Sequence, residues 1–227
     1  MLIPSLAAIF GSNSQPQQIT DAEGNVYEIA SDGTVTLVSS PTVEDLDAEF
    51  APQIEELEAA LAKKPDDAET LRSLADKSMT WGYRVMRKAT TDEEKIHAND
   101  LLSQAIRYYD GYLANNSSNE AFVSRAMCRH YMGDTDDAIT DLTNLLATED
   151  YSIAWANLGL LYEIKGEYSN ALDAYQSAIE ADPDDADGAK SYAENRIAQI
   201  NGTSSTSTPT NSGSLEDTLR ENTGIGF

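Results

Sequence analysis

The sequence predicts an all-α protein of stacked helical hairpins, with a small β segment before the helices and a flexible tail after them. Three observations predict this. A 33-residue spacing recurs in the middle of the chain, short β-branched segments precede it, and residues 201–213 contain only Asn, Gly, Thr, Ser and Pro. Such a polar stretch is typical of a flexible linker. We therefore divide the chain into 1–41, 42–200, 201–213 and 214–227.

Residues 1–41 are expected to form an arm and a β segment. Residues 26–29 and 34–38 are rich in β-branched and aromatic side chains, and Gly24 and Gly33 supply turns around them. This predicts a hairpin, or a three-stranded meander if residues 17–20 join it. The first ten residues, MLIPSLAAIF, are apolar and contain no Lys or Arg. They are too few for a membrane span and lack the positive start of a signal peptide. We therefore expect an apolar arm that packs against another protein surface.

Residues 42–200 are predicted to be helices joined by short turns. Pro52 is expected to separate a short helix at 43–50 from a second at 52–63, because proline is tolerated in a first turn. Two long helices are expected at 67–88 and 92–116. A last helix is expected at 185–200, with Asp184 and Asp185 at its start and Asn201-Gly202 as its C-terminal cap.

The repeat decides the architecture. Ala105, Ala138 and Ala171 are 33 residues apart, and Gly133 and Gly166 share that spacing. A period in the thirties with helical spacing inside it predicts hairpins that stack into a continuous core.

The best unit is IAWANLGLLYEIKGEYSNALDAYQSAIEADPDD, which resembles a tetratricopeptide repeat. Eight signature positions match, namely Trp155, Leu158, Gly159, Tyr162, Ala171, Tyr175, Ala178 and Pro183. The resemblance implies that the small residues allow close helix approach, that the large ones pack between helices, and that proline ends the second helix. Residues 122–150 form a weaker copy, and the resemblance covers roughly residues 52–200.

The resemblance also implies a concave groove that binds peptides. One subclass of the family grips a terminal carboxylate with Lys, Arg and Asn from successive first helices. Asn157 stands at the asparagine position and is our groove candidate, but Ser124 replaces its equivalent in the preceding unit and the Lys and Arg are not evident. A carboxylate clamp is therefore only a secondary expectation.

Charge and motif content narrow the function classes. The chain has 15 Lys and Arg against 39 Asp and Glu, a net charge of −24, which disfavours nucleic acid and anionic membranes and favours basic partners. No phosphate loop, metal-spaced His/Cys set or nucleophile signature is present, so we expect no enzyme activity, no cofactor and no metal. Residues 182–194 match part of a calcium loop, but Pro183 occupies the first ligand position, which favours helix capping instead.

The segment SLEDTLRENTGIGF at 214–227 follows the linker. Leu215 and Leu219 lie four residues apart on one face of a predicted short helix, and Ile225 and Phe227 follow it. These four residues predict a docking peptide. The favoured function is a structural subunit that self-associates into a filament, ring or particle through its arm and tail, so its partners would be copies of itself. The alternative is an adaptor that binds a client peptide, with the acidic surface favouring a basic client.

The sequence leaves two locations for the protein. The absence of a signal peptide and the single cysteine favour the cytoplasm, whereas an assembly subunit could equally be extracellular or part of a virion. Sequons at Asn115, Asn116 and Asn201 would matter only for an exported protein.

Overall fold

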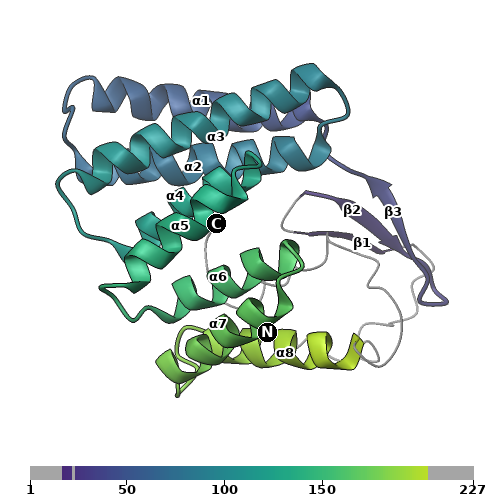
Figure 1. Cartoon of the computed structure of the whole chain (residues 1–227). Helices are drawn as coiled ribbons and strands as arrows, with labels where there is room; N and C mark the ends of the chain where they lie inside the picture. Colours follow the sequence, from purple (N-terminus) through teal and green to yellow (C-terminus); the bar gives the residue numbers. More distant parts are fainter. Residues whose placement is uncertain (1–16, 22–23, 204–227) are drawn as a thin grey trace.

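The structure, a computed structural model, describes residues 17–21 and 24–203 (Figure 1). A small antiparallel sheet precedes a helical solenoid in this part of the chain. The strands are β1 Gln17–Thr20, β2 Val26–Ile29 and β3 Val35–Ser39. The helices are α1 Val43–Leu61, α2 Ala68–Lys88, α3 Asp92–Leu113, α4 Asn119–Tyr131, α5 Thr135–Leu146, α6 Ser152–Ile164, α7 Tyr168–Ala181 and α8 Ala189–Thr203. The predicted fold class is confirmed.

The sheet is the three-stranded alternative, with the order β1-β2-β3. A polar contact joins it to the solenoid. Asn25 Oδ1 accepts hydrogen bonds from Ser40 Oγ at 2.6 Å and from Lys88 Nζ at 3.2 Å. Lys88 is the last residue of α2, so this contact fixes the sheet beside the C-terminal end of that helix.

Helix α1 corrects the expected break at Pro52. Residues 43–61 form one helix that begins with a capping box between Thr42 and Asp45 and runs through the proline. Phe50 and Ile54, on either side of Pro52, are buried against α2 and α3, whereas Pro52 itself is exposed. A proline inside a helix costs about 3 kcal/mol, and burial of such side chains stabilises by about 1.5–3 kcal/mol each, which is enough to hold the helix together.

The helices form two layers. Each helix contacts the next along the chain, and in addition α2 contacts α4, α4 contacts α6, and α6 contacts α8. The alternate helices α3, α5 and α7 make no comparable contact with one another in the described residues. The even-numbered helices therefore lie closer to one another than the odd-numbered helices do. We call α2, α4, α6 and α8 the inner layer and α1, α3, α5 and α7 the outer layer.

The 33-residue glycine spacing reflects a repeated turn. Gly133 and Gly166 follow α4 and α6 with φ of 98° and 77°. In both turns the glycine N–H and the next N–H bond back to carbonyls of the preceding helix, with Asp134 N bonded to Arg129 O and Glu167 N to Tyr162 O. Glycine adopts this left-handed conformation without steric cost, which explains its recurrence.

The last helix differs from the expectation at both ends. It begins at Ala189 rather than 185, because the Asp182 carboxylate accepts hydrogen bonds from the backbone of Ala186 and Ala189 and forms a turn there. Asp185 bonds to Ser191 N, while Asp184 has no such role in the described hydrogen bonds. Residues 201–203, which the sequence assigned to a cap and a linker, are the last turn of α8.

Candidate interaction surface

Most of the predicted packing residues of the repeat lie between α6 and α7. Five are buried, namely Leu158, Gly159, Ala171, Tyr175 and Ala178. Trp155 and Tyr162 are half-buried, and the Trp155 indole donates to Asp150 Oδ1 at 2.9 Å. Pro183 is exposed and follows α7, which ends at Ala181. The five buried positions form the interior of the hairpin and support its surface.

A buried ion pair ties α8 to this hairpin. Arg196 of α8 bonds Glu163 of α6, with Nε 3.1 Å from Oε2, and the side chains are 5% and 13% exposed. The Tyr175 hydroxyl from α7 donates to the same carboxylate oxygen at 2.9 Å. One carboxylate therefore fixes three helices at the C-terminal end of the solenoid.

Asn157, the groove candidate, is fully buried. Its Nδ2 donates to the backbone carbonyl of Ile153 at 2.8 Å, and its side-chain oxygen has no partner among the described residues. Contact between Asn157 and a bound peptide therefore stays a prediction, and it would require the side chain to become accessible. Ser124, the corresponding residue in the preceding unit, is also buried.

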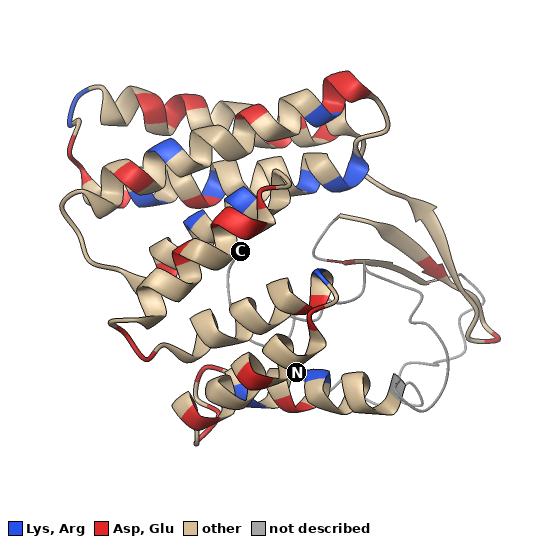
Figure 2. Cartoon of the chain, viewed as in Figure 1, with Lys and Arg blue, Asp and Glu red and all other residues tan. Residues whose placement is uncertain are grey.

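Charge is sorted between the two layers (Figure 2). Three outer helices, α1, α5 and α7, contain no Lys or Arg, and α1 alone carries seven Asp and Glu. Helix α2 of the inner layer carries five Lys and Arg against two Asp and Glu, and α4 carries two against one. Basic side chains are therefore more frequent in α2 and α4 than in the outer helices, although Arg72, Arg84, Arg125 and Arg129 are paired with carboxylates and α6 contains no Lys or Arg.

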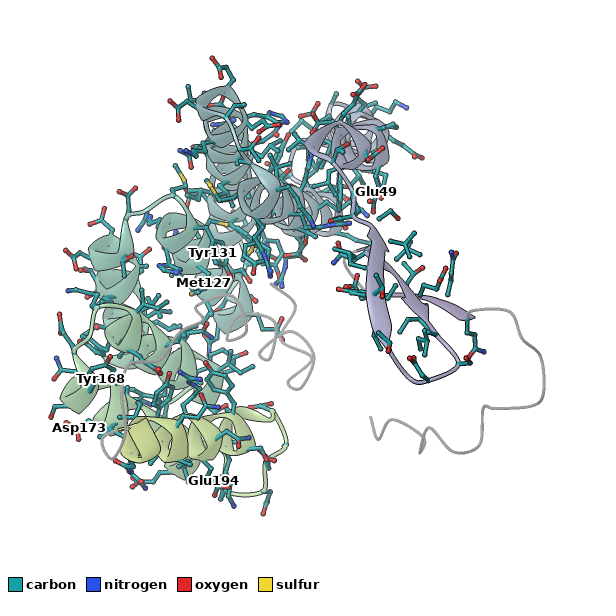
Figure 3. The ribbon with its side chains drawn as sticks, turned by 90° about the vertical axis from the view of Figure 1, so that its right-hand side faces the viewer. Glu49, Met127, Tyr131, Tyr168, Asp173 and Glu194 are labelled. Carbon is teal, nitrogen blue, oxygen red and sulfur yellow. The ribbon has the colours of Figure 1, made fainter. Side chains whose placement is uncertain are left out.

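The inner layer also carries an aromatic and basic group, which we call the Tyr83 cluster: Tyr83, Arg87, His130 and Tyr131. The rings of Tyr83 and Tyr131 are 4.6 Å apart, and those of His130 and Tyr131 are 5.5 Å apart. Arg87 is exposed and its Nη1 lies 3.3 Å from the Tyr83 hydroxyl. Figure 3 labels Tyr131 and, one turn earlier on α4, the fully buried Met127. Aromatic and arginine side chains are the types enriched at protein interfaces.

No group of three His, Cys, Asp or Glu among the described residues could hold a metal ion. Cys128 is buried, and that burial raises the pKa of its thiol far above the ordinary value, so it is not poised as a nucleophile. None of the described helices is long and apolar enough to span a membrane.

The comparison with family models decides the identity of the repeat. The model described as "Tetratricopeptide repeat" matches residues 152–185. The chain contains a tetratricopeptide repeat. No curated protein matches the sequence. The matched unit is α6 and α7 with the turn that follows them, the hairpin whose interior is described above.

One solved structure of a tetratricopeptide-repeat protein has a similar fold. A thermophilic TPR protein in Thermus thermophilus superimposes with a TM-score of 0.52 at 21% identity, over 66% of this chain and 74% of that one. Two structures of MamA align with TM-scores of 0.45 and 0.48 at 23% and 19% identity. They cover 60% and 83% of this chain, and 66% and 94% of their own. The MamA alignment with the TM-score of 0.45 thus spans just under two thirds of that MamA chain. At these identities the likeness shows the fold alone.

The predicted docking residues Leu215, Leu219, Ile225 and Phe227 lie outside the described residues, as does the arm MLIPSLAAIF. The Tyr83 cluster, in contrast, was missed by the sequence analysis. Counting charge helix by helix, rather than over the whole chain, would have indicated the basic character of α2.

Proposed function

We propose that the protein is a non-enzymatic assembly subunit whose tail, residues 214–227, docks on the inner layer of another copy. The observation that carries this proposal is the Tyr83 cluster together with the basic character of α2. The tail combines the apolar residues Leu215, Leu219, Ile225 and Phe227 with the acidic residues Glu216, Asp217 and Glu221. Tyr83 itself is buried, and the cluster presents the half-buried rings of His130 and Tyr131 beside the exposed Arg87, which is complementary to such a segment.

The geometry of this contact favours an open or cyclic assembly. The tail and the inner layer are different surfaces of the chain, so a contact between them is heterologous. Heterologous contacts close into rings or extend into filaments, depending on the rotation between neighbours. The linker 201–213, shortened to 204–213 by the last turn of α8, would give the tail its reach.

Size-exclusion chromatography with light scattering tests the proposal on the full chain and on a 1–203 truncation. We expect the full chain to show a mass above that of a monomer that rises with concentration, and the truncation to be monomeric. Ile225→Ser with Phe227→Ser should copy the truncation, because each buried apolar side chain contributes about 1.5–3 kcal/mol. Monomeric behaviour of the full chain at every concentration would contradict the proposal.

A charge reversal locates the receiving surface. Arg87→Glu, in the Tyr83 cluster, should weaken the association, and rising salt should weaken it further. Lys63→Glu is the matched control, because Lys63 is exposed in the turn between α1 and α2. Equal effects of the two substitutions would place the contact elsewhere.

The adaptor alternative uses the same surface for a client protein. The basic inner layer then selects an acidic, apolar segment, whereas a basic client of the kind suggested by the net charge would suit the outer face of α1. A full chain that remains monomeric, together with an Arg87→Glu variant that loses binding to an acidic peptide, would favour this alternative.

A further inference from the structure

The three-stranded sheet is amphipathic. Its register places Ile19, Tyr27 and Leu37 side by side across the strands, and Ile29 beside Val35 two residues further along. Side chains two residues apart on a strand share a face, so these five apolar residues lie on one face, with Gln17 beside Ile29 at its edge. The row between them, Gln18, Glu28 and Thr36, lies on the opposite face and is polar, although Val26 and Val38 at the end of the sheet also lie on that face.

The apolar face is half exposed. Ile19, Val35 and Leu37 are 48%, 55% and 53% exposed. Val38 is 51% exposed but adjoins Leu37 on β3, so it lies on the opposite face. Ile96 and Ile164 are exposed singly on different helices. Single exposed apolar side chains are ordinary, but a contiguous group on one face of a small sheet indicates that something docks there.

We propose that residues 1–10 of the same chain, MLIPSLAAIF, cover this face. The sheet cannot be stable on hydrogen bonds alone, because small sheets need an apolar layer against one face. The arm supplies such a layer: eight of its ten residues belong to the apolar types Met, Leu, Ile, Ala and Phe.

The arm is within reach. Residues 11–16, GSNSQP, join it to the first residue of β1. Six residues span up to about 20 Å. Three strands spaced about 4.8 Å apart, with about 3.3 Å per residue, make a face of only about 10 by 15 Å. A chain that turns back at Gly11 therefore reaches every apolar residue of the face.

The area of the apolar face indicates which occupant covers it, the arm of the same chain or a second copy of the protein. Two such faces packed together would bury roughly 300–600 Å² in all, well below the approximately 1,200 Å² of a stable interface between separate chains. A tethered segment avoids that requirement, because the short connection gives it a high effective concentration. The sequence alone predicts that the arm docks on a neighbour, and the small area of this face instead favours its own chain.

Pairs of introduced cysteines test the contact on the full-length protein. Ala8→Cys is combined with Leu37→Cys on the apolar face, or with Thr36→Cys on the polar face as the matched control. Cys128 is fully buried, so it does not compete for the oxidant. At low protein concentration we expect the pair at positions 8 and 37 to form an intramolecular disulfide at least about tenfold faster than the control pair, because the docked arm raises its effective concentration at one face only.

Two outcomes would overturn the proposal. Equal rates for the two pairs would mean that the arm does not select the apolar face. Disulfide dimers from a mixture of Ala8→Cys chains and Leu37→Cys chains, formed faster than with Thr36→Cys chains, would mean that the arm docks on a second copy. The same pairs in the 1–203 truncation separate this test from the tail-mediated assembly, because the arm contact should persist there while the assembly is lost.

A second measurement does not depend on cysteine chemistry. Deletion of residues 1–12 should speed hydrogen exchange of the β2 and β3 amides, while exchange in α6 and α7 stays unchanged. The double substitution Leu2→Ser with Ile9→Ser, which keeps the chain length, should give the same result. Unchanged exchange in the strands of both variants would overturn the proposal.

Discussion

The ring of Tyr175 lies against the backbone of Gly159, so close that a β-carbon at residue 159 would stand 2.6 Å from two ring carbons. Gly159 is in α6 and Tyr175 in α7, and both are buried. The Tyr175 hydroxyl is also bonded to Glu163, so the ring cannot swing away without losing a buried hydrogen bond. The close approach of these two helices therefore depends on the absence of a side chain at residue 159.

Gly159→Ala should accordingly destabilise the protein. Alanine is favoured over glycine in a helix by up to about 1 kcal/mol, but overpacking of a tight core costs about 1–3 kcal/mol. We expect a net loss in the free energy of unfolding, measured by urea denaturation followed by circular dichroism. Gly202→Ala in α8 is the control, because no atom of the described residues lies within 4 Å of its β-carbon position. A Gly159→Ala protein as stable as the control would show that the hairpin relaxes freely.

Removal of the Glu163 carboxylate should have a larger effect. Glu163→Ala leaves the buried Arg196 guanidinium and the Tyr175 hydroxyl without their acceptor. Breaking a buried ion pair by removing one partner costs about 3–5 kcal/mol. Glu180→Ala, at an exposed position of α7, should change stability by less than about 0.5 kcal/mol. If Glu163→Ala costs no more than Glu180→Ala, the ion pair does not hold α8 in place.

Pro52→Ala should stabilise the protein. Pro52 is exposed in the interior of α1, where it has no N–H to donate to the carbonyl four residues earlier. Alanine restores that hydrogen bond and relieves the ring clash, and we expect a gain of about 1–3 kcal/mol in thermal or chemical unfolding. Glu56→Ala, also exposed in α1, controls for the change in side-chain size. A loss of stability would indicate that Pro52 sets a bend that the packing of α1 requires.

The sequence predicted the solenoid because the same packing problem recurs in every hairpin. Ala138 and Ala171 are fully buried at equivalent places, and Gly133 and Gly166 form the same turn. A local pattern that repeats along the chain can be detected without knowing what it contacts. The three-stranded sheet was predicted as an alternative for a similar reason, since its turns are marked by glycines.

The structural features that the sequence did not predict depend on contacts between residues distant in sequence, or on which helices share a layer. Pro52 was expected to break α1, because the burial of Phe50 against Trp81 of α2, with ring centroids 6.1 Å apart, is not visible in the local sequence. The Tyr83 cluster joins α2 to α4 through Tyr83 and Tyr131, which are 48 residues apart, and its basic setting is hidden by a net charge of −24. Sorting charge by layer requires the stacking order of the helices, which the repeat predicts only for the better-matched units.

The capping carboxylate of α2 provides a test by pH. Asp67 accepts from the Thr70 hydroxyl at 2.7 Å and from the Thr70 N–H at 3.1 Å, and these hydrogen bonds lower the pKa of Asp67 below its ordinary value of 3.8. A lowered pKa in the folded state means that the stabilisation is complete above 3.8 and is lost as the pH falls through the lower, folded value. Asp67→Asn keeps a good N-cap but cannot titrate. We therefore expect the urea midpoint of Asp67→Asn to fall less steeply than that of the wild type between about pH 5 and pH 3. Asp66→Asn, one residue before the cap and exposed, should follow the wild type, and identical slopes for all three proteins would show that the Asp67 carboxylate does not contribute to acid sensitivity.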